Sequence, residues 1–268
     1  MRAQDLRRTD AHPLPFVMGI LNATPDSFSD GGRYIDADAA VEHAFEMIDA
    51  GAEIIDIGAE STRPGYTPVP EDEEIARLVP VIERLSESSD VIISVDTMKT
   101  EAARAAVSAG ADIVNDVNSL RWPGMMDLIS ETDVPVIMMH MTGFPQDTHS
   151  LTVEGPVIDA VRDFLNERIG AAEEHGISRD RIIIDPGIGF GKTMDQNEEL
   201  LRGLDRIGID LPLLAGISRK RVLATMYPGM DADEATVKAS LIAAEKGADI
   251  LRVHDVKRMA EAIQNMNL

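Results

Sequence analysis

Six polar residues suited to catalysis or ligand binding stand where short apolar runs give way to loops. Each run is followed by a helical pattern. If the runs are parallel strands of one sheet, these side chains converge at its carboxyl edge, where enzymes built on such sheets place their chemistry. We therefore expect the functional site at that edge, built from Asn22, Asp96, Asn115, Asp185, Lys220 and Arg252.

Two of these residues are carboxylates, Asp96 and Asp185. Two carboxylates facing one cavity could be an acid/base pair, metal ligands or acceptors for a ligand rich in N–H groups. Neither has a His or Glu neighbour at metal-ligand spacing, so we do not expect a closed metal cage. The paired oxygens of a carboxylate suit the N–H donors of an aminopyrimidine edge. A simpler interpretation, in which each aspartate caps the next helix, stays open.

Other candidates have an ordinary structural alternative. Asn115 can donate and accept, as recognition of a heterocycle requires, but it could equally cap a helix. The next residue, Asp116, is expected to support the loop. Phe190 lies in a glycine-rich segment and could stack on a flat ring or anchor that loop. Met139 could line the cavity, although the sequence alone favours a place in the core.

Basic residues are informative because the chain is acidic, with a formal net charge of −22. Any phosphate site must therefore be built from local cations. Lys220 follows the seventh apolar run, and Arg252 and His254 stand at the end of the eighth, where such folds often bind phosphate. Arg63 lies in a turn-rich segment, and Asn22 could complete the anion site. Rim salt bridges with the abundant carboxylates are the alternative.

One glycine-rich segment resembles a nucleotide-binding phosphate loop only superficially. Residues 186–193 read PGIGFGKT, ending in Gly191, Lys192 and Thr193. The phosphate-loop pattern requires its first glycine where Pro186 stands. We therefore expect no nucleoside triphosphate site there.

The elements that must position these residues follow a regular alternation. Apolar runs suited to strands are separated by helix-length segments, which indicates one (β/α)8 TIM barrel of the α/β class. A Gly-Ala-acidic-Ile phrase recurs at residues 51–54, 110–113 and 247–250, with each glycine placed to end a helix. A doubly wound open sheet is the structural alternative. The eight runs are residues 16–21, 54–58, 91–95, 113–114, 134–139, 182–184, 211–215 and 250–253.

Composition agrees with a single domain over residues 1–268, in which 1–15 form an N-terminal extension. The chain is 44% apolar and has no cysteine, which excludes disulfides and thiol catalysis and fits a cytoplasmic location. No apolar stretch reaches membrane-span length, and the charge disfavours nucleic acid and anionic membranes as partners. Three long segments, 22–36, 59–70 and 140–155, are typical of functional loops.

Five segments together resemble those of the dihydropteroate synthase family. They read MGILNATPDSFSDGG at residues 18–32, ESTRPG at 60–65, DPGIGFGK at 185–192, SRK at 218–220 and RVHDV at 252–256. The first two are highly specific, and the resemblance runs from about residue 16 to 263. Departures from the family pattern include Ala59, where many members have glycine, and Arg221, where a serine is frequent.

The resemblance implies a TIM barrel that joins 6-hydroxymethyl-7,8-dihydropterin diphosphate to 4-aminobenzoate and releases diphosphate in folate synthesis. It also implies Mg2+ as a cofactor, ligated partly through Asn22, a homodimer and a sulfonamide target. Asp96, Asp185, Lys220, Arg252 and His254 are then the expected catalytic set. The binding residues it implies are Asp96, Asn115, Met139, Asp185 and Lys220 for the pterin, Asn22, Arg63, Arg252 and His254 for the diphosphate, and Thr62, Pro64, Phe190 and Ser218 for the aminobenzoate.

Two other functions are compatible with part of this pattern. A pterin-binding methyltransferase barrel that serves a corrinoid protein would share the pterin carboxylates, but would need neither the SRK segment nor the complete first loop. A non-catalytic paralogue that only binds pterin could keep Asp96 and Asp185 while losing Asn22, Arg63 or His254. All five residues are present.

Overall fold

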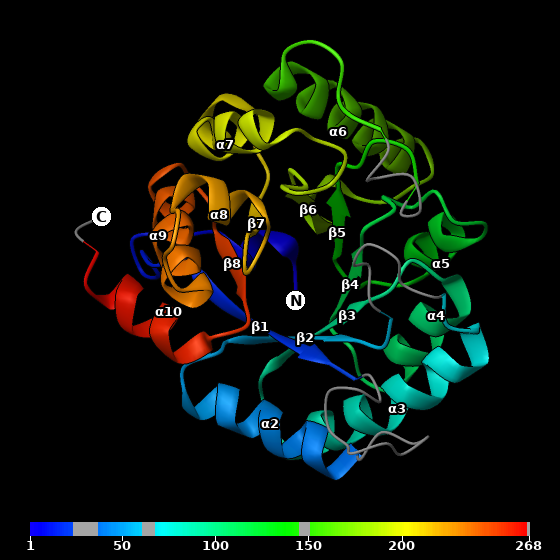
Figure 1. The fold of residues 1–268 in the computed structure, drawn as a ribbon. Coiled ribbons are helices and arrows are strands. Elements are labelled where there is room, and N and C mark those ends of the chain that lie inside the picture. The colour runs from blue at the N-terminus through cyan, green and yellow to red at the C-terminus, as the bar shows by residue number, and fades with distance from the viewer. Residues whose placement is uncertain (24–36, 61–67, 145–150, 267–268) are drawn as a thin grey trace.

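Eight strands alternate with helices around one ring in the computed structural model, which describes residues 1–23, 37–60, 68–144 and 151–266 (Figure 1). The strands are β1 (Phe16–Asn22), β2 (Ile54–Gly58), β3 (Ile92–Asp96), β4 (Ile113–Asp116), β5 (Val136–Met139), β6 (Ile182–Asp185), β7 (Leu214–Gly216) and β8 (Ile250–Val253). The α-helices are α2 (Ala37–Asp49), α3 (Glu71–Ser88), α4 (Thr100–Ser108), α5 (Met125–Glu131), α6 (Val157–Glu174), α7 (Met194–Arg202), α8 (Val222–Met226), α9 (Ala232–Glu245) and α10 (Val256–Gln264). Short 3-10 helices are η1 (Ala3–Leu6), η2 (Arg179–Arg181) and η3 (Leu204–Arg206).

The sheet is parallel and nearly closed. Its order is β6-β5-β4-β3-β2-β1-β8-β7, so β1 lies between β2 and β8. An isolated parallel bridge between Ile184 and Leu213 joins the two ends of the ring. An open doubly wound sheet would leave two edge strands, so this closure excludes that alternative and confirms the predicted barrel.

Two strands begin two or three residues later than the apolar pattern predicts. The runs that start at Val134 and Leu211 become β5 and β7, which begin at Val136 and Leu214. Each run contains a proline, Pro135 or Pro212, just before its strand. Proline has no N–H to give to the ladder, so regular pairing starts after it.

The inward-facing side chains form two layers. The lower layer is apolar and takes one residue from each strand: Met18, Ile54, Ile92, Ile113, Ile137, Ile183, Leu214 and Ile250. Because side chains alternate along a strand, the residue two positions further on faces inward again. Those upper positions are Ile20, Asp56, Ser94, Asn115, Met139, Asp185, Gly216 and Arg252. The lower layer fills the barrel, and the mainly polar upper layer forms the floor of a cavity.

The recurring glycines end helices as predicted. Gly51, Gly110 and Gly247 have φ values of 104°, 114° and 94°, which a residue with a Cβ rarely adopts. The N–H of the alanine after each glycine donates to a carbonyl five residues back, as in a Schellman motif. These caps turn the chain from α2, α4 and α9 into the next strand.

Two residues of the N-terminal extension 1–15, Ala3 and Leu6, reach the barrel core. Ala3 and Leu6 of η1 are 0% and 1% exposed and pack in the lower apolar layer. In Figure 1 the N-terminus lies within the ring of strands. The segment therefore closes the end of the barrel opposite the cavity. Within the described ranges, no helix has the length and apolar character needed to cross a bilayer.

Candidate active site

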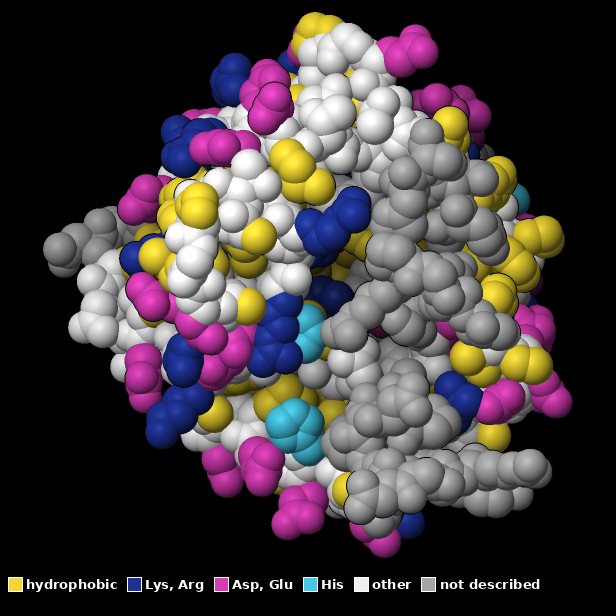
Figure 2. Space-filling model, viewed as in Figure 1, with side chains coloured by type: hydrophobic (Ala, Val, Ile, Leu, Met, Phe, Trp, Pro, Cys, Tyr) yellow, Lys and Arg dark blue, Asp and Glu magenta, His cyan; other side chains and the backbone are white. Residues whose placement is uncertain are grey.

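A cavity of about 390 Å3 opens at the carboxyl ends of the strands. On this face Lys, Arg and His side chains gather near a central hollow, whereas Asp and Glu lie mainly toward the edge (Figure 2). The predicted site residues that line the cavity are Asn22, Asp96, Asn115, Met139, Asp185, Phe190, Ser218, Lys220, Arg252 and His254. Thr62, Arg63 and Pro64 lie outside the described residues.

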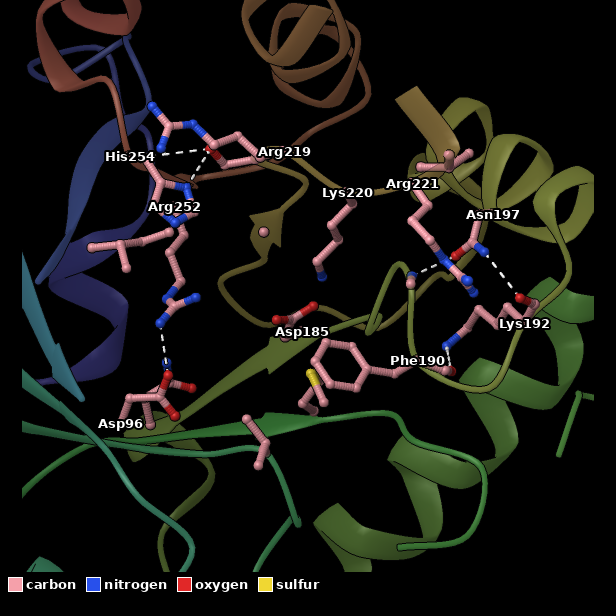
Figure 3. A pocket seen from close by; sticks show the side chains of 18 of the residues that line it. Asp96, Asp185, Phe190, Lys192, Asn197, Arg219, Lys220, Arg221, Arg252 and His254 are labelled. Carbon is pink, nitrogen blue, oxygen red and sulfur yellow. Dashed lines mark hydrogen bonds and ion pairs between the residues drawn. The ribbon is translucent and has the colours of Figure 1, made fainter. Parts of the chain in front are cut away.

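Arg252 joins two aspartates on one side of the cavity floor. Its Nε donates to Oδ2 of Asp56 at 2.5 Å, and its Nη2 donates to Oδ2 of Asp96 at 2.7 Å. Arg252 and Asp96 point toward each other in Figure 3. Burial opposes the charge of Arg252, but the facing Asp56 and Asp96 outweigh it and raise the pKa of the guanidinium above its usual value. This arginine is therefore a fixed cation.

Asp96, unlike Arg252, is not fixed in its charged form. Burial raises the pKa of Asp96 to about 7, against the lowering effect of Arg252. A change in the charges around it can therefore shift its protonation near neutral pH. Asp96 does not act simply as a helix cap, because its carboxylate faces the cavity and is bound to β8.

Asp56 is a site residue that the sequence pattern did not single out. Its side chain is fully buried under the cavity, and Oδ2 also accepts from Nδ2 of Asn115 at 3.1 Å. This contact uses one N–H of the Asn115 amide and orients the group, leaving its oxygen as an acceptor for a ligand. The signal was available, since Asp56 interrupts an apolar strand two positions after an inward-facing isoleucine.

Asp185 and Lys220 face each other on the side of the cavity floor opposite Arg252 (Figure 3). Oδ1 of Asp185 accepts from the N–H of Gly187 at 2.7 Å, so one oxygen shapes the local turn. Burial raises the pKa of Asp185 and lowers the pKa of Lys220 to about 8. The ammonium of Lys220 donates to the carbonyl of Ile188 and lies 4.6 Å from the ring centre of Phe190.

The apolar part of the cavity adjoins Phe190. Met139 is only 2% exposed, yet it lines the cavity. Its sulfur-containing side chain belongs to a small cluster with Val117 and Met141, against which Phe190 packs. A flat ring entering from the mouth can thus meet an apolar wall on one side and the charged floor on the other.

His254 is held by Ser218. The hydroxyl of Ser218 lies 2.8 Å from Nδ1 of His254 and accepts from its backbone N–H at 3.2 Å. Ser218 therefore orients the imidazole, and its predicted contact with aminobenzoate stays a prediction. Arg219 adopts a φ of 57°, and its side chain pairs with Asp233 outside the cavity floor. That turn presents Lys220 inward.

Asp116 supports its loop, as predicted. Its two carboxylate oxygens accept from the N–H groups of Asn118 at 2.7 Å and Leu120 at 2.6 Å. Ser119 and Leu120 have φ values of 53° and 59°, which these contacts stabilise. Burial raises the pKa of Asp116 to about 6. The side chain shapes the chain next to Asn115 and does not line the cavity.

A second missed group lies at the rim. Glu60 lines the cavity, and its Oε2 accepts from Nζ of Lys99 at 2.7 Å. The same ammonium donates to Oε2 of Glu74 at 2.6 Å and to the carbonyl of Val69 at 2.6 Å. Thr97 donates to the other oxygen of Glu74. This buried network holds Glu60 and Val69, which lie on either side of residues 61–67.

The donor set at the mouth fits a weakly held hard cation. Asn22 is half-buried at the end of β1 and offers an amide oxygen. In the part of the chain that the structure describes, no group of three His, Asp or Glu side chains could form a metal cage. Mg2+ usually keeps several waters and uses one or two protein oxygens together with substrate phosphates. Asn22 suits that chemistry.

Comparisons with known proteins agree on one family. Residues 18–254 match the family described as pterin binding enzyme. The dihydropteroate synthase of Streptococcus pyogenes serotype M18 is 49% identical over 251 residues, which cover 90% of each chain. A structure of Xanthomonas albilineans dihydropteroate synthase with 4-aminobenzoic acid has a TM-score of 0.87 and 47% identity, covering 94% of this chain and 91% of that one. The same enzyme in complex with 7,8-dihydropteroate has a TM-score of 0.83 and 44% identity, covering 94% and 92%.

Proposed function

The chain belongs to the pterin-binding enzyme family, among the dihydropteroate synthases, and we propose that the cavity at its barrel mouth is the active site. The reaction joins 6-hydroxymethyl-7,8-dihydropterin diphosphate to 4-aminobenzoate, giving 7,8-dihydropteroate and diphosphate in folate synthesis. The observation that supports this site is the convergence of Asp96 and Asp185 with Arg252 and Lys220 in one cavity.

The pterin ring binds on the cavity floor. Its aminopyrimidine edge carries adjacent N–H donors, which a carboxylate accepts side by side. Asp185 offers the oxygen that the Gly187 N–H does not use. Asn115 offers its amide oxygen, because Asp56 holds the nitrogen. Met139 and Phe190 provide the apolar contacts for the ring faces.

The diphosphate binds toward the mouth. Arg252 keeps donors for it, since a guanidinium has five N–H groups and the two aspartates do not use them all. His254, oriented by Ser218, adds a directional donor. Asn22 would hold Mg2+, which supplies positive charge to offset the charge of the leaving diphosphate. Arg63 belongs to this set by resemblance.

The aminobenzoate binds beside Phe190, above the reactive methylene of the pterin. Its amine is neutral at pH 7, so attack requires no strong base. Arg221 is exposed at the cavity wall and offers a cation to the aminobenzoate carboxylate. Thr62 and Pro64 complete the subsite by resemblance. Sulfonamides carry the same aniline group, so we propose that they compete for this position.

Different residues of the chain assist different steps of the reaction. The bond between the methylene carbon and the diphosphate oxygen breaks as Arg252 and His254 stabilise the negative charge growing on the leaving group. The electron-rich pterin spreads the positive charge left on the methylene, and the carboxylates of Asp96 and Asp185 favour that charge. The amine nitrogen then forms the new C–N bond and loses its extra proton to water. Orientation of the two reactants can contribute roughly 7–11 kcal/mol in well-ordered systems.

One assay tests the function. The purified protein is mixed with pterin diphosphate, 4-aminobenzoate and Mg2+ at low and high salt, and dihydropteroate is measured. Formation of the product only with both substrates supports the proposal, and absence of product at both salt concentrations contradicts it. Pterin binding without product would point to the silent paralogue. Methyl transfer from a methylated pterin to a corrinoid protein would point to the methyltransferase.

We also propose a homodimer in the cytoplasm. Helices α8 and α9 lie in the part of the ring where the resemblance places the subunit contact, and they carry partly buried apolar residues. Those on or next to these helices include Met226, Tyr227, Met230, Leu241 and Ile242. Light scattering would give about twice the chain mass of 29.1 kDa for a dimer. A monomer at micromolar concentration would contradict it.

A further inference from the structure

Lys192 is buried at the end of the glycine-rich loop that carries Phe190. It is 7% exposed, and its ammonium lies among three acceptors of the protein itself. Nζ contacts Nδ1 of His140 at 2.8 Å, the carbonyl of Gly187 at 2.7 Å and the carbonyl of Phe190 at 3.0 Å. An ammonium has three N–H donors, so these contacts satisfy it completely.

The contact with His140 has a defined direction. Burial, with the nearby positive charge of Lys192, lowers the pKa of His140 to about 2, so the imidazole is neutral. Nδ1 then accepts from Lys192, and the ring proton is on Nε2. Burial also lowers the pKa of Lys192, against the opposing effect of Asp185. The carbonyls of Gly187 and Phe190 can only accept, so Lys192 donates to both of them in either protonation state.

Two glycines let the loop lie close against the segment after β5. A Cβ at Gly187 would lie 1.9 Å from the carbonyl oxygen of His140, and a Cβ at Gly191 would lie 2.5 Å from Cβ of Thr142. Both glycines have positive φ, 66° and 61°. The loop after β6 thus lies directly against the segment after β5, and Lys192 joins the two through His140.

This arrangement connects the two halves of the active site. At one end of the loop, the N–H of Gly187 holds Asp185 on the cavity floor. At the other end, Phe190 forms the wall of the aminobenzoate subsite, and its carbonyl is bound by Lys192. Lys192 binds both Gly187 and Phe190, so it sets the distance between the floor and that wall (Figure 3).

We propose that Lys192, braced by His140, is a positioning residue that fixes Phe190 in place for the aminobenzoate acceptor. This inference rests on the proposed function, because it concerns the second substrate of that reaction. Lys192 does not bind phosphate in this arrangement, since its donors are already used inside the loop. The superficial likeness of this segment to a phosphate loop thus has a different physical basis.

Steady-state kinetics of substituted enzymes test the inference. Lys192→Met keeps most of the length of the unbranched side chain but removes the three hydrogen bonds. His140→Leu removes one acceptor, while His140→Asn keeps an oxygen near the position of Nδ1. We expect KM for 4-aminobenzoate to rise on the order of tenfold to a hundredfold in Lys192→Met, as for a misplaced reactant. His140→Leu should show a smaller rise, and His140→Asn should restore most of the affinity.

The affinity for the pterin substrate serves as the internal reference, measured by calorimetry on the same proteins. It should change far less than KM for aminobenzoate. Leu165→Ala, a fully buried change on the outer helix α6, controls for lost stability and should leave both constants unchanged. If Lys192→Met does not fold, the two His140 variants decide.

An unchanged KM for aminobenzoate in Lys192→Met, an equal loss of pterin affinity, or equal KM values in His140→Leu and His140→Asn would overturn the inference. The KM values and pterin affinities of the variants are each compared with those of the wild-type enzyme. Absence of dihydropteroate from the wild type would instead overturn the proposed function, so the two failures are distinguishable.

Discussion

Arg252 enters the cavity floor between two aspartates, and this contact fixes both its orientation and its charge. The guanidinium is held by Asp56 and Asp96 on neighbouring strands. An arginine held in this way would lose little freedom on binding the diphosphate that we propose it contacts, because its side chain is already ordered. Asp56 therefore supports the proposed anion site from beneath the cavity, where its side chain is fully buried.

The substitution Asp56→Asn tests this role. It removes the charge beside Arg252 and places an amide where Oδ2 accepts two donors. A hydrogen bond to a charged group is worth about 1.5–3 kcal/mol, so we predict a roughly tenfold to hundredfold fall in kcat/KM for pterin diphosphate. Steady-state kinetics with varied pterin substrate measures it.

Asp249→Asn is the matched control for Asp56→Asn. Asp249 is also buried and accepts from a backbone N–H, that of Leu213, but it lies beside the opposite end of the barrel. It should reduce stability and leave kcat/KM unchanged. Equal kinetic losses in both variants would show that Asp56 acts only through the fold.

The pH profile should follow two floor residues. Burial raises the pKa of Asp96 to about 7 and lowers the pKa of Lys220 to about 8. Below the first value Asp96 gains a proton and loses acceptor capacity, and above the second Lys220 loses its charge. We predict a bell-shaped kcat/KM for the pterin substrate with limbs near these values, because this constant reports the free enzyme.

Lys220→Arg separates the two limbs of that profile. Arginine stays protonated throughout the measurable range, so the alkaline limb should disappear while the acid limb remains. Initial rates between pH 5.5 and 9.5, taken at low pterin concentration, measure both limbs. An alkaline limb that persists in Lys220→Arg would assign it to another group.

At the scale of the elements, strand ends were predictable and cross-strand partners were not. The apolar runs end at Asp96, Asn115 and Asp185, and parallel strands bring such ends to one rim regardless of register. The pairing of Arg252 with Asp56 depends instead on the ring closing β8 against β1, so that residues 196 positions apart meet. No local pattern contains that information.

The contact between Lys192 and His140 was hidden for a similar reason. Each residue follows a different strand, β6 or β5, and the two meet because those strands are neighbours. The local sequence around Lys192 suggested a comparison with phosphate loops and a family segment, but neither gave Lys192 a partner. Glycine positions, in contrast, were readable, because a positive φ at a helix end is a local requirement.

The contacts between Lys99 and two glutamates should dominate the stability of the β2–α3 and β3–α4 connections. Lys99, Glu60 and Glu74 are all buried, with side chains 8%, 8% and 2% exposed. Lys99→Met would leave two carboxylates buried without their cation. Breaking a buried ion pair typically costs about 3–5 kcal/mol, so we predict a loss of that order in the free energy of unfolding.

Urea denaturation followed by circular dichroism measures that loss. Lys238→Met is the control, because Lys238 makes an exposed ion pair with Glu234 on α9. Such surface pairs contribute about 1 kcal/mol or less. Similar losses in the two variants would mean that the Lys99 network is no more stabilising than a surface contact.

At the scale of the whole molecule, the net charge opposes the long-range approach of the diphosphate substrate. The formal net charge is −22, yet cations gather at the cavity mouth (Figure 2). The diphosphate substrate is therefore repelled at a distance and attracted nearby. At 0.1 M, added salt screens the long-range repulsion beyond about 10 Å, while contacts inside the cavity are screened much less.

The same repulsion acts within the folded chain, so salt should also stabilise it. Like charges destabilise the compact state, and their screening raises the free energy of unfolding. We predict that the thermal midpoint rises as NaCl is increased from 0.02 M to 1 M. The rise should be about 2–4 °C for each kcal/mol gained in the free energy of unfolding. Differential scanning calorimetry measures the midpoint.

A triple substitution of Glu83, Glu87 and Glu199 by Gln tests the cause of the salt effect. All three are exposed, so the variant loses three charges and should start from a higher midpoint with a weaker salt response. A response as steep as that of the wild type would assign the salt effect to ion binding or to general salting-out instead of charge repulsion.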